Sequence, residues 1–100
     1  MKTKTVTICG SMKFRDKIQE ICERLELESK YAVIGITLHV LNRELSAAEK
    51  ALLGELHKTK IDISDAIFVV NVGGYIGESV KSEIEYAKKA GKEILYLEND

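Results

Sequence analysis

AIFVVNVGGYIGESVKSEIEYAKKAGKEILYL, residues 66–97, contains in one stretch the pattern that decides the fold. The apolar run over 66–71 predicts a buried strand, and the glycine-rich segment that follows predicts a turn. Apolar residues at helical spacing then predict a helix over about 78–90, which Gly91 ends, and residues 93–97 predict another strand. Strand, helix and strand in this order are typical of a βαβ unit with parallel strands.

The N-terminal half of the chain has the same alternation. Residues 5–9 (TVTIC) predict a strand that stops at Gly10-Ser11, and we expect a helix over about 13–28. Residues 31–38 (YAVIGITL) are apolar throughout, which predicts a second strand buried on both faces.

Between these halves, residues 39–45 predict a loop. Ser46 and Glu49 have the spacing of a capping box, which predicts a helix that reaches Ile61 or beyond. We therefore predict one α/β domain over residues 1–100. It is a three-layer, doubly wound parallel sheet of four to five strands, of the flavodoxin/Rossmann-like kind.

Composition and charge exclude several classes of function. The 100 residues are 45% hydrophobic and 31% charged, and 15 basic against 16 acidic side chains leave a net charge of −1. A duplex nucleic acid partner needs clustered Lys and Arg, so none is expected. No apolar run approaches the roughly 18 residues of a membrane span, and residues 1–10 lack a signal peptide's apolar stretch. We expect a cytoplasmic protein with no membrane partner.

The two cysteines are expected to be packing residues in a reduced compartment. Cys9 falls at the end of a predicted strand, and Cys22 falls on the apolar face of a predicted helix. Neither lies in a spacing pattern typical of metal ligands. The sequence therefore predicts no structural zinc, and no metal or organic cofactor is expected.

The predicted topology locates a site. Ligands of doubly wound sheets bind at the carboxyl ends of the strands, where the strand order reverses, and the loops over 9–12 and 71–77 lie there. Glycine turns before a helix leave backbone N–H groups free for an anion or a sugar hydroxyl, although glycine is also the default wherever φ must be positive. The candidate substrate-binding residues from these loops and the next helical turn are Gly10, Ser11, Asn71, Gly73, Gly74, Tyr75, Gly77 and Ser79.

One glutamate of the helix over 78–90 differs from its neighbours. A spacing of about 100° per residue gathers most charges on one solvent face, which consists of Glu78, Lys81, Glu85, Lys88 and Lys89. Glu83 lies apart from them, in a sector that it shares with Ser79 and Tyr86 and that has no other charge. Either this carboxylate reaches round to water, or it is held beside a pocket as a nucleophile or base.

Three segments together resemble a known family. They are TICGSMKF near the start, HKTKIDISDAIFVVN in the middle, and GGYIGESVKSEIEYA with GKEILYLE at the end. This combination resembles the nucleoside 2-deoxyribosyltransferase superfamily, especially its short branch, over nearly the whole chain except about residues 36–50. The superfamily includes enzymes that exchange bases on 2-deoxynucleosides and N-glycosidases that hydrolyse deoxynucleoside monophosphates. The resemblance also implies a homodimer or a higher homo-oligomer.

The resemblance implies roles for two residues. The family's nucleophile lies in an E-[LI]-x-Y-A-like segment, which here is residues 83–87, so Glu83 would attack the anomeric carbon. The family's usual acid is an aspartate eight residues before the aspartate that opens the third strand. Counting back from Asp65 gives His57 instead, which a histidine's proton chemistry makes the candidate proton shuttle; a partly exposed helix histidine is the alternative.

A second departure from the family concerns an orienting tyrosine. Many relatives carry it in the first strand, where this chain has Thr7 and Ile8. An orienting hydroxyl would therefore come from elsewhere: Tyr75 and Tyr86 are candidates, and the alternative for both is a packing role. The expected function is therefore transfer or hydrolysis of the N-glycosidic bond of a 2-deoxynucleoside or its 5′-monophosphate. The alternative is a nucleotide-binding sensor on the same scaffold that performs no chemistry.

Overall fold

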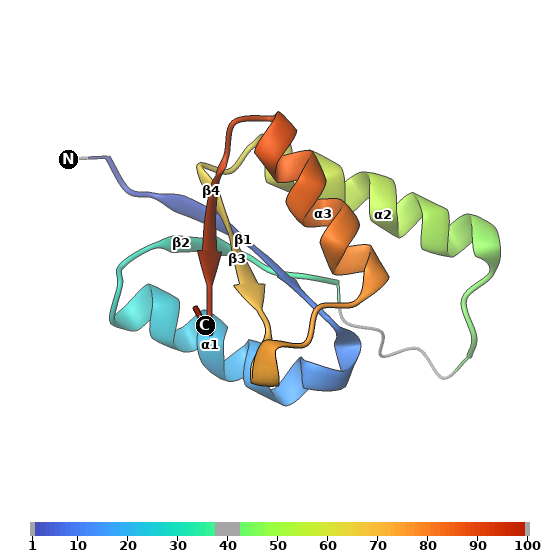
Figure 1. Cartoon of the computed structure of the whole chain (residues 1–100), viewed down its shortest axis with the longest axis horizontal. Coiled ribbons are helices and arrows are strands. Elements are labelled where there is room, and N and C mark those ends of the chain that lie inside the picture. Colours follow the sequence, from blue (N-terminus) through green and yellow to red (C-terminus); the bar gives the residue numbers. More distant parts are fainter. Residues whose placement is uncertain (1, 38–42, 100) are drawn as a thin grey trace.

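The computed structural model describes residues 2–37 and 43–99 and shows a parallel α/β fold (Figure 1). In chain order its elements are β1 (Thr5–Gly10), α1 (Arg15–Leu27), β2 (Ala32–Ile34), α2 (Ala47–Asp62), β3 (Ala66–Val70), α3 (Glu78–Lys89) and β4 (Glu93–Tyr96). Short 3₁₀ turns over Met12–Phe14 and Val72–Gly74 follow β1 and β3. The described part of the predicted loop over 39–45 is 43–45; Leu38 to Asn42 lie outside the described residues.

The four strands form one parallel sheet in the order β2-β1-β3-β4. The central pair, β1 and β3, runs in register from Val6 opposite Ala66 to Gly10 opposite Val70. The chain leaves β1 toward one edge and leaves β3 toward the other, so the strand order reverses between these two carboxyl ends. This confirms the predicted doubly wound α/β fold.

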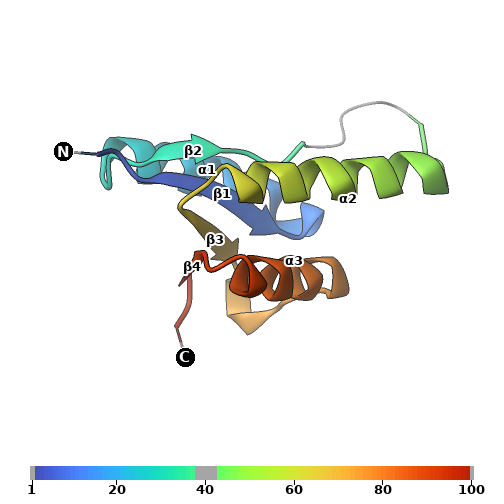
Figure 2. The same cartoon turned by 90° about the horizontal axis from the view of Figure 1, so that it is seen from above.

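Helices cover both faces of the sheet, which gives three layers (Figure 2). Because successive strand residues point to opposite faces, Ile8 packs with α1 while Cys9 packs with α2 and α3. The α1 side is anchored by Ile18 and Ile21, both nearly fully buried. On the opposite side the buried apolar residues of the two helices are Ile61, Val80, Ile84 and Ala87.

The helix boundaries follow the predicted signals. Ser46 caps α2, its side chain accepts from the Glu49 N–H at 3.1 Å, and the Glu49 carboxylate accepts from the Ser46 N–H at 2.9 Å. This capping box satisfies backbone donors that the helix itself leaves free. The predicted stop signal also holds for α3, which ends at Lys89, just before Gly91 with its φ of +75°. Among the described residues, no helix combines the length and the apolar character that crossing a membrane requires.

The second strand differs from its prediction. Residues 31–38 were expected to form a strand buried on both faces, but β2 covers only Ala32–Ile34, with Ala32 exposed and Val33 and Ile34 half-buried. It lies at the edge of the sheet, and within residues 2–37 and 43–99 its one strand partner is β1. An edge strand has one neighbour and partial cover, so apolar residues there do not imply full burial.

Candidate active site

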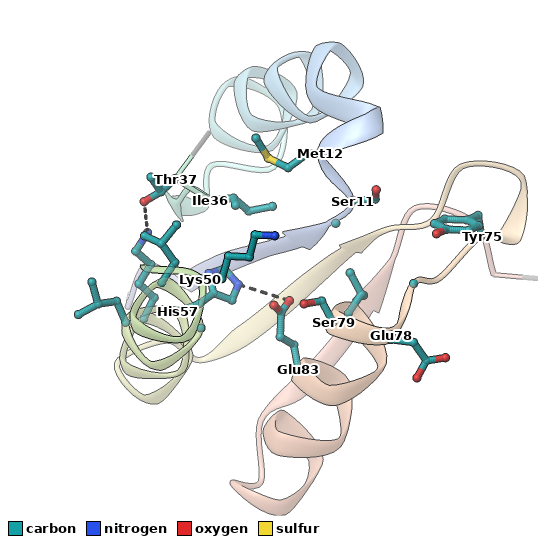
Figure 3. Close-up of a pocket in the computed structure, with 17 residues that line it drawn as sticks. Ser11, Met12, Ile36, Thr37, Lys50, His57, Tyr75, Glu78, Ser79 and Glu83 are labelled. Carbon is teal, nitrogen blue, oxygen red and sulfur yellow. Dashed lines mark hydrogen bonds and ion pairs between the residues drawn. The ribbon is translucent and has the colours of Figure 1, made fainter. Parts of the chain in front are cut away.

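A pocket of about 590 Å³ opens at the carboxyl ends of β1 and β3, between α2 and the start of α3 (Figure 3). Its walls come from the Gly10-Ser11 turn, from one face of α2 and from the first turns of α3. This is the reversal point of the strand order, where the topology predicts a ligand site.

Glu83 is directed into this pocket from α3 (Figure 3). Its side chain is 21% exposed, and burial raises the pKa of its carboxyl above the ordinary value. The side chain of Glu78, by contrast, is 94% exposed, and Glu85 is exposed on the solvent side. The helical spacing therefore separated the inward glutamate from the two outward ones.

His57 faces Glu83 across the floor of the pocket. It projects from α2, and its Nε2 lies 3.6 Å from Glu83 Oε1, with only 9% of the side chain exposed. Burial, and after it the Lys60 charge, lowers the pKa of His57 to about 4, while a hydrogen bond with the Ile8 backbone acts in the opposite direction. The ring is therefore neutral at pH 7, and the contact with Glu83 is not an ion pair.

Nε2 of His57 faces both Glu83 Oε1 and Cys9 Sγ. A neutral imidazole carries one N–H donor and one lone pair, and the tautomer decides which of them Nε2 presents. The site thus places a buried, neutral histidine next to a mostly buried carboxylate.

Cys9 completes a group of three reactive side chains that the sequence did not reveal. Its Sγ lies 3.5 Å from His57 Nε2, and it is fully buried in the core cluster under α2 and α3, as a packing residue should be. Burial, and after it the nearby Glu83 charge, raises the pKa of the Cys9 thiol. The protonated thiol is therefore a hydrogen-bond donor to this site, and no cysteine spacing motif marks it.

The candidate substrate-binding residues divide into two groups. The pocket is lined by Gly10, Ser11, Tyr75, Gly77 and Ser79, as expected for a site in these loops.

The other three, Asn71, Gly73 and Gly74, do not line it. The Asn71 amide donates to the Glu98 carbonyl at 2.9 Å and accepts from the Glu98 N–H, and the Gly73 N–H donates to the Glu98 carboxylate. The Gly74 N–H closes a turn onto Asn71. These groups hold the segment after β4 against β3, so they are engaged within the protein.

Neither tyrosine contacts Glu83 through a hydrogen bond recorded among the described residues. Tyr86 donates to Asp62 Oδ1 at 2.6 Å on the exposed side of α2 and α3. The Tyr75 ring is covered by the Lys13 ammonium, 3.7 Å from its centroid, and meets Phe14 edge to face.

The hydroxyl of Thr7 in β1 is also engaged elsewhere. Thr7 bonds to Ser64 and to the Lys60 carbonyl. The thiol of Cys9 is therefore the side chain of β1 that reaches the Glu83–His57 pair. Asp65 fixes the entry to β3, because its carboxylate accepts from the Thr5 N–H at 2.8 Å and ties β3 to β1.

One wall of the pocket, formed by a single face of α2, was not predicted from the sequence. Lys50, Leu53, Gly54 and His57 line it at helical spacing, with Lys60 one turn further on. Lys60 Nζ donates to the Gly35 carbonyl at 3.1 Å and to Thr37 Oγ1 at 3.3 Å, which joins α2 to the segment after β2. The signal was present in the polar and small residues Lys50, Gly54 and Lys60, which lie at helical spacing on the face that carries His57.

No family model matches the chain, and no curated protein matches it significantly. Among solved structures, a conserved protein from Enterococcus faecalis V583 matches with a TM-score of 0.67 and 16% sequence identity. The likeness covers 99% of this chain and 65% of that one, so this chain spans about two thirds of its neighbour's length. At this identity the comparison establishes the α/β fold alone.

Proposed function

We propose that this protein breaks or transfers the N-glycosidic bond of a 2-deoxynucleoside or its 5′-monophosphate, with Glu83 as the nucleophile. One observation carries the proposal: a partly buried carboxylate is directed into a pocket at the reversal point of the sheet, with a neutral histidine 3.6 Å away. The resemblance of residues 83–87 to the family's nucleophile segment selects the same residue.

The first step is attack at the anomeric carbon. A Glu83 carboxylate oxygen forms a bond to C1′ as the C1′–N bond breaks, and the nucleobase departs with the electron pair. The base takes a proton from water at the open mouth of the pocket. The product is a deoxyribosyl ester of Glu83.

In the second step His57 acts as a base. Nε2 takes a proton from a water molecule, or from the N–H of an incoming base, as that molecule attacks C1′. The ester bond breaks and the Glu83 carboxylate is regenerated, after which His57 returns its proton to solvent. The step uses the neutral ring in the tautomer whose lone pair is on Nε2.

The remaining lining residues supply contacts for the sugar and its 5′ substituent. Ser79 lies on the same side of α3 as Glu83 (Figure 3), and the N-terminus of α3 at Gly77 favours negative charge. Ser11 faces this point from the turn after β1, and Lys50 adds positive charge from α2. A hydroxyl or a phosphate at the 5′ position fits these groups.

The test compares two glutamates of the same helix. Glu83→Gln and Glu85→Gln are incubated, like the unaltered protein, with 2-deoxynucleosides and their monophosphates. Free base is followed by chromatography and the protein by intact mass spectrometry. We expect base release and a deoxyribosyl adduct in the unaltered protein and in Glu85→Gln, and neither in Glu83→Gln. Unchanged base release by folded Glu83→Gln would refute the nucleophile.

One feature of the pocket favours the second candidate, a nucleotide-binding sensor without chemistry. Among its described lining residues Glu83 is the only inward carboxylate, because Glu78 faces solvent, so a protein acid for the departing base is missing there. Isothermal titration calorimetry separates the two functions. Nucleotide binding that persists in Glu83→Ala, with no base released by the unaltered protein from any nucleoside, identifies the sensor.

A further inference from the structure

The three reactive side chains at the base of the pocket come from three different elements: Cys9 from β1, His57 from α2 and Glu83 from α3. Cys9 Sγ and Glu83 Oε1 lie 3.5 Å and 3.6 Å from the same atom, His57 Nε2. The sulfur, nitrogen and oxygen atoms all lie within 4.8 Å of one another. We propose that Cys9, His57 and Glu83 form a binding site for a thiophilic divalent metal ion of the Zn²⁺ type.

The spacing of the three atoms fits this ion. Tetrahedral zinc holds sulfur, nitrogen and oxygen at about 2.0–2.3 Å, which places neighbouring ligand atoms about 3.3–3.6 Å apart. Two of the three separations have such values already. The third closes by rotation of the Glu83 side chain, which retains 21% of its surface toward the pocket.

The chemistry of the ligands also selects this class of metal. Mg²⁺ and Ca²⁺ require several oxygen ligands, whereas a thiolate and an imidazole favour zinc and similar ions. Three protein ligands leave a fourth position, which faces the pocket and suits water or a small ligand.

Charge balance favours the bound ion. Binding replaces the thiol proton of Cys9, which is released to solvent, so a thiolate, a carboxylate and a neutral imidazole surround a charge of +2. The buried site is then neutral as a whole.

This inference does not rest on the glycosyl chemistry proposed above. A Glu83 carboxylate bound to zinc is no longer a free nucleophile, so the two uses of the site exclude each other. Sequence spacing could not reveal the site because its ligands converge only through the parallel pairing of the sheet and the packing of α2 beside α3.

Cobalt substitution tests the ligands directly. Co²⁺ is added to metal-free protein in equimolar amount, and the thiolate-to-cobalt charge-transfer band is recorded. We expect the band in the unaltered protein, in Cys22→Ser, whose thiol lies on the opposite side of the sheet, and in Glu85→Gln. It should vanish in Cys9→Ser, and His57→Gln and Glu83→Gln should bind at least tenfold more weakly. A band that persists in Cys9→Ser, or that is lost in Cys22→Ser, overturns the proposal.

A second measurement does not depend on the folding of any variant. Zn²⁺ that binds only the folded state raises the melting temperature of the unaltered protein in proportion to the logarithm of its free concentration. Chelator competition then gives the affinity and a stoichiometry of one ion per chain. A melting temperature that Zn²⁺ does not raise means that the three side chains form a hydrogen-bonded cluster only, and the proposal fails.

Discussion

His57 Nε2 lies 3.6 Å from Glu83 Oε1, although the two residues belong to different helices. Both side chains point toward Cys9 near the carboxyl end of β1, which is where the strand order of the sheet reverses. A base and a carboxylate that are both mostly buried and adjacent have a cost in desolvation, which function explains better than stability. Substitution of either residue of the pair should therefore alter activity more than it alters stability.

Loss of the histidine should separate the two steps of the proposed reaction. In His57→Gln we expect the steady-state rate to fall roughly 10²- to 10⁴-fold, because the second step loses its base. Attack by Glu83 remains possible, so the deoxyribosyl adduct should accumulate in intact mass spectra. Thr59→Ala, an exposed position on the same helix, is the control and should turn over normally. Normal turnover in His57→Gln without an adduct would contradict the role of His57.

Gly54 offers a test that separates stability from binding. It lies inside α2 and lines the pocket, and an added Cβ there meets no atom within 4 Å. Gly54→Ala should raise the free energy of unfolding by roughly 0.5–1 kcal/mol, because glycine is a poor helix former. Gly54→Leu should project a bulky side chain into the pocket and weaken nucleotide binding while the protein stays folded.

Thermal melting and calorimetry measure these two effects of the Gly54 variants. Ala51→Leu is the control, since this exposed position on α2 does not line the pocket. If Gly54→Leu binds nucleotide as tightly as Ala51→Leu does, the ligand lies elsewhere.

Gly10 is predicted to be essential for packing as well as for the site. A Cβ at this position would lie 3.2 Å from Val70 Cβ and 3.3 Å from Ile18 Cδ1, between β3 and α1. Gly10→Ala should therefore lower the free energy of unfolding by roughly 1–3 kcal/mol in urea denaturation. Gly35→Ala is the matched control, because its Cβ meets nothing within 4 Å, and it should change stability by about 0.5 kcal/mol or less. Equal stability of the two variants would show that β3 and α1 adapt freely.

Asp65 should make stability depend on pH in the acid range. Its hydrogen bond from the Thr5 N–H, and then the Lys2 charge, hold the pKa of this carboxyl below 3.8 in the folded protein. A depressed pKa contributes stability that is complete above the unfolded value and is lost as the pH falls through the folded value. Asp65→Asn should therefore be less stable than the unaltered protein at neutral pH, and the difference should shrink well below pH 3.8. The measurement is the urea denaturation midpoint of both proteins at neutral pH and at a pH well below 3.8. A stability difference that is the same at the two pH values would contradict the link between Asp65 ionisation and stability.

The sequence by itself determined the features that depend on local periodicity. Strand and helix alternation predicted the doubly wound fold, because buried parallel strands and amphipathic helices have distinct apolar spacings. The helical period also separated Glu83 from the outward Glu78 and Glu85, and the Ser46–Glu49 spacing predicted where α2 begins. The extent of β2 was overestimated, because apolar character does not distinguish an edge strand from a central one.

Only the tertiary structure decided which distant residues meet. Cys9 reaches His57 and Glu83 because β1 is central and because α2 and α3 cover the same face of the sheet. Asn71 and Gly73 lie in a predicted binding loop, and Glu98 in the segment after β4 forms hydrogen bonds with both of them. Local spacing specifies the face of a helix on which a side chain lies, whereas strand order and helix packing determine what that side chain contacts.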